Sequence, residues 1–286
     1  MLMAPAGRIK QAQSLSDLSE IDTTSMNFEF FHAMDTGRAR ANNEDSVAVD
    51  ESHGLAVLAD GMGGYNAGEV ASSMATSFVC SEMGRWLAET GVRAMDVDVR
   101  RAMEICVDNA NRAIFNAANS NPQYAGMGTT LVVAAFRNAQ LRLGHVGDSR
   151  AYRWRAGQLT QITRDHSLLQ EQIDAGLITP EQAAFSANKN LVTRAVGVED
   201  TVLLESNLHE LAVGDVYLLC SDGLSDMLDD AMMAQLLQQH PTLANAAQAL
   251  IDAANDAGGK DNIALVLVRV LASPGQAGRP WWRFGR

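Results

Sequence analysis

Strand-like and helix-like segments alternate in an uneven order along the chain. Apolar residues that alternate with polar ones, or run together briefly, predict strands at 27–34, 46–50, 54–59, 128–136, 140–147, 150–155, 158–162, 202–208, 215–220 and 262–271. Helical spacing predicts helices at about 66–88, 97–119, 230–239 and 243–256, with short helices within 167–187. Strands that follow one another without a helix between them pair antiparallel. The order therefore predicts one α+β domain, in which helices cover packed antiparallel sheets.

Both ends of the chain lack this patterning. Residues 1–26 are polar and without periodicity, which predicts a flexible N-terminal segment. Residues 272–286 contain Pro and Gly, followed by Trp281 and Trp282 among arginines, and predict a flexible tail. Since Trp and Arg are frequent anchors, a short docking segment is the alternative for this tail. The folded unit is thus expected at 27–271.

Charge and cysteine content narrow the class of protein. The 286-residue chain carries 22 Lys and Arg against 34 Asp and Glu, a net charge of −12, which argues against a basic groove for nucleic acid. Three cysteines without a CxxC pair favour a reducing compartment. The chain has neither a signal-peptide core nor a long apolar run, so we expect a cytoplasmic protein without a transmembrane segment.

Four acidic residues lie where strongly apolar strands end, each beside glycine or asparagine: Asp60, Asp148, Asp222 and Asp261. A carboxylate at the end of a buried strand is costly unless it is paired or binds a cation. Mg²⁺ and Mn²⁺ prefer oxygen ligands and would resolve the mutual repulsion of four carboxylates. Each Asp alone could simply form a turn, but the set of four favours a metal site.

The segment RARANNEDS adds the acidic pair Glu44 and Asp45, and Arg40 four residues before Glu44. A guanidinium matches a pair of phosphate oxygens, so Arg40 is a candidate phosphate ligand, with a surface ion pair as the alternative. The glycine-rich segment DGMGGYNAGE is neither GxGxxG nor a P-loop. Its glycines would let the backbone approach an ion, which makes the Gly61 carbonyl a candidate ligand.

Other catalytic classes have weak support. There is no GxSxG motif, and the adjacent residues Asp165, His166 and Ser167 cannot form a triad by themselves. The histidines form neither HxxxH nor HExxH, and His145 is expected to pack or to form a hydrogen bond near the end of the sheet.

Taken together, the segments resemble the metal-dependent protein phosphatase family, type 2C, in its compact bacterial form. The resemblance covers about residues 28–270 in the family's order, through RARANNEDS, LADGMGGYNAGEVAS, GMGTTLV, GHVGDSRAYRW, TRDHSLLQEQIDAG, NLVTRAVG, LLCSDGLSDML and GGKDNIALVLV. It implies a central β-sandwich of two antiparallel sheets flanked by helices on both faces. It also implies a flap at about residues 165–195.

The resemblance assigns two or three Mn²⁺ or Mg²⁺ ions per chain. Asp60 would bridge two metals, Asp222 and Asp261 would complete the first site, and the Gly61 carbonyl would serve the second. Asp148, together with Asp222, resembles the third-metal site of bacterial members. Two further residues, Glu44 and Asp45, would hold metal-bound waters, and Arg40 would hold the substrate phosphate. A water bridging two metals would then attack phosphorus directly.

Two departures from the family pattern concern proton transfer and selectivity. Met62 stands where many eukaryotic members have a histidine thought to protonate the leaving group, so the general acid is unassigned. The flap carries Ser186-Ala187-Asn188-Lys189-Asn190 where relatives often have a His-Pro-x-Arg-Asn run.

The resemblance implies a Ser/Thr protein phosphatase that opposes a bacterial Ser/Thr kinase and acts on phosphorylated proteins as a monomer. A pseudophosphatase that binds phosphoprotein without turnover and a hydrolase of small phosphate esters are the alternatives. All four metal aspartates are present, which argues against the pseudophosphatase.

Overall fold

The computed structural model of the chain describes residues 26–64, 67–183 and 191–272. Two antiparallel sheets form its centre, one with the strand order β1-β11-β10-β7-β8 and the other with β2-β3-β5-β6-β9, where β4 pairs with β3. The strands are β1 Asn27–Asp35, β2 Asp45–Asp50, β3 Leu55–Met62, β4 Gly128–Thr129, β5 Leu131–Arg137, β6 Gln140–Val146, β7 Arg150–Arg155, β8 Gln158–Gln161, β9 Glu205–Glu210, β10 Val216–Cys220 and β11 Ile263–Leu271.

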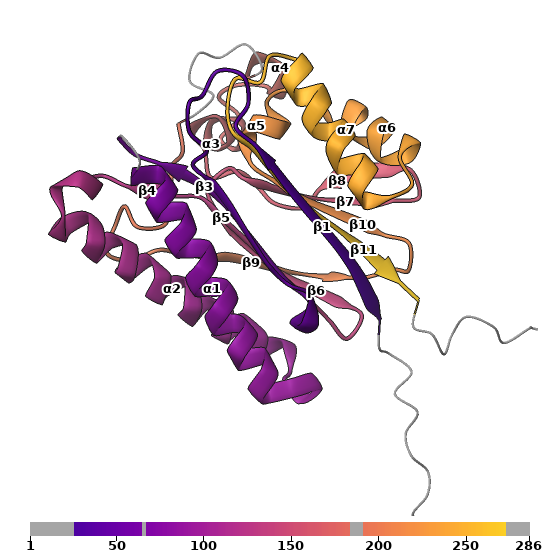
Figure 1. The fold of residues 1–286 in the computed structure, drawn as a ribbon, viewed down its shortest axis with the longest axis horizontal. Coiled ribbons are helices and arrows are strands. Elements are labelled where there is room, and N and C mark those ends of the chain that lie inside the picture. The colour runs from indigo at the N-terminus through magenta and orange to yellow at the C-terminus, as the bar shows by residue number, and fades with distance from the viewer. Residues whose placement is uncertain (1–25, 65–66, 184–190, 273–286) are drawn as a thin grey trace, which may run out of the picture.

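Helices cover the outer face of each sheet, so the molecule has four layers (Figure 1). On one side, α1 Ala67–Thr90 and α2 Asp96–Ser120 pack on β3 and β5; on the other, α6 Asp230–Gln239 and α7 Leu243–Asp256 pack on β10 and β11. The shorter helices are α3 Leu168–Asp174, α4 Pro180–Ala183 and α5 Asp222–Ser225, with single 3₁₀ turns at Glu51–His53, Gly91–Arg93 and Pro122–Tyr124. The predicted helix–sheet–sheet–helix sandwich is confirmed.

Side-chain alternation explains why the central strands are apolar throughout. In β11, Leu265 and Leu267 face α7, whereas Val266 and Val268 face the opposite sheet. A strand buried on both faces needs apolar residues at every position, because successive side chains point to opposite sides. Three separate cores result, one between the sheets and one under each helical layer.

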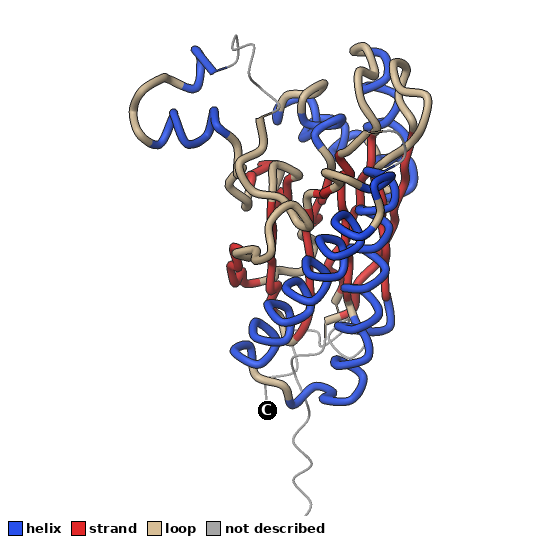
Figure 2. Tube along the Cα trace, turned by 90° about the vertical axis from the view of Figure 1, so that its left-hand side faces the viewer, coloured by secondary structure: helices blue, strands red, loops and turns tan. Residues whose placement is uncertain are grey.

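The loop at 36–44 and the short helix α5 lie at the same end of the sandwich (Figure 1). There α3 and α4 stand out from the body of the molecule (Figure 2). Within the described part of the chain, every helix is either too short or too polar to cross a bilayer.

Candidate metal centre

The ends of several strands meet at one edge of the sandwich and enclose a cleft of about 230 Å³. The cleft is lined by every residue that the sequence predicts for the site except Asp45, namely Arg40, Glu44, Asp60, Gly61, Asp148, Asp222 and Asp261, together with Met62, Gly63, Thr130, Val192 and Asn262. The predicted residues among them come from β3, the β6–β7 connection, α5 and the loops before β2 and β11. Predicted residues as far apart in sequence as Arg40 and Asp261 thus share one site.

Asp45 lies beside this lining, because it stands opposite Asp60 in the antiparallel register of β2 and β3. Like charges directly opposite one another on neighbouring strands destabilise a sheet. The backbone of Asp60 is nevertheless held firmly: its N–H donates to Thr130 Oγ1 at 2.9 Å, and its carbonyl accepts from Thr129 Oγ1 at 2.8 Å. The fold therefore keeps two carboxylates close together against their repulsion.

Burial and mutual repulsion raise the pKa values of these carboxyl groups. Burial, followed by the charges of Asp148 and other carboxylates, raises the pKa of Asp222 to about 8. For Asp45, burial is again the main cause and raises its pKa to about 7, although a hydrogen bond from Ser221 opposes the shift. Burial, followed by the charges of Asp45 and Asp222, holds the pKa of Asp60 well above its usual value. The protein alone thus disfavours the charged form of each group.

Two buried carboxylate oxygens, Asp45 Oδ1 and Asp222 Oδ1, have no hydrogen-bond partner among the described residues. Buried polar atoms are almost always satisfied, so an unsatisfied pair within one acidic cluster requires a cause. Divalent cations that prefer oxygen would neutralise the charge and occupy the free lone pairs. The residues present therefore fit Mn²⁺ or Mg²⁺.

Arg40 lies at the rim of the cleft, with about half of its side chain exposed. Its Nη2 donates to Asp261 Oδ2 at 2.7 Å, and this hydrogen bond raises the pKa of the guanidinium. The ion pair considered for Arg40 from the sequence is thus present, but its partner is a residue of the predicted metal site. Since a guanidinium carries five N–H donors, this pairing is compatible with a second, anionic partner in the cleft.

Glycine 61 has a packing role that the sequence did not indicate. A Cβ atom at this position would lie 2.1 Å from the carbonyl oxygen of Gly68, in the first turn of α1. At Gly68, a Cβ atom would lie 2.8 Å from Gly61. The two glycines therefore allow β3 and α1 to approach closely, while the Gly61 backbone still lines the cleft.

Two positioning residues escaped the sequence interpretation. The buried Asn262 side chain donates to the carbonyl oxygens of Thr36 and Asn42 at 3.0 and 2.8 Å, and accepts from the Glu44 N–H at 2.8 Å. It thereby fixes the loop that carries Arg40. The Ser221 hydroxyl donates to Asp45 Oδ2 at 2.7 Å. Both residues adjoin a predicted metal aspartate in sequence, which was the only signal available.

Met62 lines the cleft as its position in the sequence implied, and its thioether cannot transfer a proton. His145 accords with its predicted structural role, with Nε2 lying 2.8 Å from the Arg164 carbonyl oxygen. Several predictions concern residues that the structure does not describe: the start of the helix expected at about residue 66, the segment 186–190 that departs from the family pattern, and nearly all of the flexible segments expected at 1–26 and 272–286.

The raised pKa values predict how pH affects the metal-free protein. Unfolded Asp loses its proton near a pKa of about 3.9, whereas folded Asp45 keeps its proton up to a pKa of about 7 and folded Asp222 up to a pKa of about 8. Because the native state binds more protons between these values, the free energy of unfolding falls as pH rises through this range. Melting curves in chelator should show this decline, and Mn²⁺ should raise the melting temperature more at pH 8 than at pH 6. An equal Mn²⁺ effect at both pH values would contradict the coupling.

The chain matches a model of the protein phosphatase 2C family over residues 37–264. It is 37% identical to the serine/threonine phosphatase stp of Listeria innocua over 237 residues, which covers 82% of this chain and 92% of that protein. It is 40% identical to the serine/threonine protein phosphatase PstP of Mycobacterium tuberculosis over 83% of this chain, but spans only 44% of PstP.

Solved structures give the same result. The crystal structure of the M. tuberculosis phosphatase PstP/Ppp superposes with a TM-score of 0.78 at 38% identity, covering 86% of this chain and 99% of that one. The PstP catalytic domain in complex with two manganese ions superposes with a TM-score of 0.75 at 38% identity, covering 86% of this chain and all of that one.

Proposed function

The chain belongs to the protein phosphatase 2C family, and we propose that it hydrolyses phosphoserine and phosphothreonine in proteins with bound Mn²⁺ or Mg²⁺. The observation that carries the proposal is the single cleft in which Asp60, Asp148, Asp222 and Asp261 face one another beside Arg40. Carboxylates that hold divalent cations next to a guanidinium match the charge of a phosphate monoester.

Divalent cations held by the carboxylates of the cleft would supply Lewis acidity and a water of lowered pKa for hydrolysis of the phosphate ester. We assign Asp60, Asp222, Asp261 and the Gly61 carbonyl to two cation sites, and Asp148 with Asp222 to a third. Glu44 and Asp45 would hold waters bound to these cations. Asn262 and Ser221 keep Glu44 and Asp45 in place through the hydrogen bonds described above.

Arg40 binds the phosphate of the substrate and stabilises the charge that spreads over its oxygens in the transition state. Changing Arg40 to Ala should raise KM for a phosphothreonine peptide and lower kcat/KM at least about tenfold, since hydrogen bonds to charged groups contribute roughly 1.5–3 kcal/mol. Arg40→Lys should recover part of the loss, because it restores the charge without the planar fork. Steady-state kinetics in saturating Mn²⁺ would detect the change; unaltered kcat and KM in Arg40→Ala would remove this role.

We further propose a cytoplasmic, monomeric enzyme that reverses the action of a Ser/Thr kinase. Residues 27–271 would form the catalytic unit, with 1–26 and 272–286 outside it and a flap at about 165–195. A chain that begins at residue 27 should therefore keep wild-type hydrolysis of p-nitrophenyl phosphate. Among the described residues, sheet pairing begins with β1 at Asn27. A large loss of activity would show that residues 1–26 support the fold.

The substrate class is tested by comparing kcat/KM for a phosphothreonine peptide and for p-nitrophenyl phosphate in Mn²⁺. A small phosphothreonine ester serves as the reference, because it has the same leaving group as the peptide. A higher kcat/KM for the peptide than for this ester supports a protein substrate. Equal turnover of the peptide and the small phosphothreonine ester would indicate a hydrolase of small esters. Binding of the peptide without phosphate release would indicate a pseudophosphatase.

A further inference from the structure

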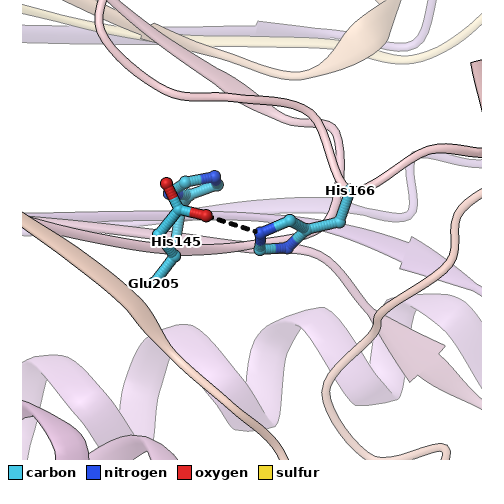
Figure 3. Close-up of side chains that lie close together, drawn as sticks. All are labelled: His145, His166 and Glu205. Carbon is cyan, nitrogen blue, oxygen red and sulfur yellow. Dashed lines mark hydrogen bonds and ion pairs between the residues drawn. The ribbon is translucent and has the colours of Figure 1, made fainter. Parts of the chain in front are cut away.

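A second cluster of ionisable side chains lies apart from the residues that line the cleft. His145 on β6, His166 just before α3 and Glu205 at the start of β9 gather around one point (Figure 3). The two imidazole rings are stacked, with centroids 4.7 Å apart and planes 15° apart. Both histidines are buried, with exposed fractions of 1% and 6%.

Hydrogen bonds fix the protons of this cluster in a way that disfavours metal binding. His145 Nε2 faces the Arg164 carbonyl oxygen, so it carries a proton. His166 Nδ1 accepts the Gly147 N–H at 3.1 Å, which places its proton on Nε2, 3.2 Å from Glu205 Oε2. The Arg194 guanidinium approaches Nε2 less closely, at 3.4 Å. Stacked rings also direct their in-plane lone pairs along separate planes, so the pair does not converge on one ion.

His166 instead holds Gly147 at two points. Its side chain accepts the Gly147 N–H, and its own backbone N–H donates to the Gly147 carbonyl oxygen at 2.9 Å. Gly147 forms the turn that leads from one sheet to the other, with φ of +101° and no room for a Cβ atom, which would lie 2.7 Å from the Thr130 side chain. The turn is thus fixed from both sides.

Asp148 follows Gly147 in the chain, and the segment after Asp148 is held through the side chain of Arg150. Asp165, the neighbour of His166, accepts from Arg150 Nη2 at 2.7 Å and from Arg150 Nε at 3.0 Å. The dipeptide Asp165–His166 therefore forms hydrogen bonds with Gly147, just before Asp148, and with Arg150, two residues after it. The backbone is thus restrained on both sides of Asp148, whose side chain lines the cleft.

We propose that His166 is a positioning residue: it keeps Asp148 where its carboxylate would hold a cation together with Asp222. The inference rests on the function proposed above and adds a group that does not touch the cation. The same histidine accepts the Thr193 N–H through its carbonyl oxygen at 2.8 Å, and Ser167 pairs with Val192. These contacts join the two ends of the 165–195 segment to each other beside the turn at Gly147.

Two variants of His166 separate the acceptor from the bulk of the ring. In His166→Asn, Oδ1 can occupy the position of Nδ1 and still accept the Gly147 N–H. In His166→Gln, the polar atoms lie one carbon further out, where they can reach Glu205 but leave Gly147 without its acceptor. His32→Gln, at an exposed histidine on β1, is the matched control.

The readout is Mn²⁺ binding, measured by isothermal titration calorimetry. His166→Gln should weaken the last Mn²⁺ to bind by about 10–100-fold, the usual effect of removing a group that supports a metal ligand. The more tightly bound ions should be unaffected, and His166→Asn and His32→Gln should keep the wild-type isotherm. An unchanged isotherm in His166→Gln, or equal losses in the Gln and Asn variants, would overturn the proposal.

Hydrogen exchange of the Gly147 amide in the unmodified, metal-free chain gives a test that needs no folded variant. The amide should be protected like those of β6, and rapid exchange would contradict its hydrogen bond to His166 and overturn the proposal. Neither measurement depends on turnover. A protein that binds Mn²⁺ as expected but releases no phosphate would therefore refute the proposed function while leaving the role of His166 standing.

Discussion

Changing Asp60 to Asn should abolish phosphate release while making the metal-free protein more stable. The two effects have one cause, because Asp60 lies opposite Asp45 and close to other carboxylates that repel it. In the proposed reaction, that charge would hold cations whose Lewis acidity contributes several kcal/mol. Losing about 4 kcal/mol of transition-state stabilisation lowers kcat roughly 10³-fold. Without metal, Asn removes both the repulsion that the charged form suffers and the cost of keeping Asp60 protonated, so the melting temperature rises.

Phosphate release in Mn²⁺ and melting curves in chelator measure the two effects on one preparation. Asp256→Asn, at an exposed residue at the end of α7, is the matched control and should alter neither. Retained activity in Asp60→Asn would remove the metal assignment. A lower melting temperature in chelator would show that Asp60 supports the fold rather than opposing it.

Changing Asn262 to Ala should have the second largest effect, although Asn262 is not expected to touch the substrate. The substitution leaves two carbonyl oxygens and the Glu44 N–H without their present partners. Each unsatisfied buried group costs about 1–3 kcal/mol, so we expect a loss of about 3 kcal/mol in the free energy of unfolding after some water enters. The loop that carries Arg40 also loses its attachment to the sheet edge, so kcat/KM should fall.

Denaturant unfolding at pH 7 in Mn²⁺ would measure the loss of stability. Asn245→Ala, near the start of α7 and exposed, is the control and should change stability little. Stability and kcat/KM both close to wild type in Asn262→Ala would show that the loop is held by other contacts.

The regular elements followed directly from the sequence where local pattern and tertiary environment agree. The helices predicted at 230–239 and 243–256 have the bounds observed for α6 and α7, because one apolar face of each packs on the sheet. The strand predicted at 54–59 runs on to Met62 as β3, since Gly61 and Met62 pair with β4. A glycine-rich segment gives no local sign of such a partner.

Two other differences have similar causes. The helix α5 occupies Asp222–Ser225, in a segment whose Asp-Gly pair indicates a turn; Asp226 N–H donates to the Asp222 carbonyl oxygen at 2.7 Å. The strand expected from Val202 begins only at Glu205, because Val202 and Leu204 pack against the core under α1 and α2 instead of pairing. Such contacts are set by the tertiary fold.

The candidate site could be predicted in part because a charged residue at the end of an apolar strand needs a physical reason. That argument finds Asp60 and Asp222 without any structure. It cannot find Asn262, Ser221 or His166, which act through hydrogen bonds to distant backbone or side-chain groups. The adjacency of His166 to Asp165 and Ser167 argued against a triad but did not indicate what the histidine holds.

Phosphate release from a phosphothreonine peptide, measured with Mn²⁺, with Mg²⁺ and with chelator, tests the central claim most directly. The chain should release phosphate with either metal, lose that activity in chelator, and lose it in Asp222→Asn under all three conditions. Release that persists in chelator or in Asp222→Asn would contradict a reaction that depends on the carboxylate cleft. A folded protein that binds Mn²⁺ without releasing phosphate would contradict the proposed catalysis.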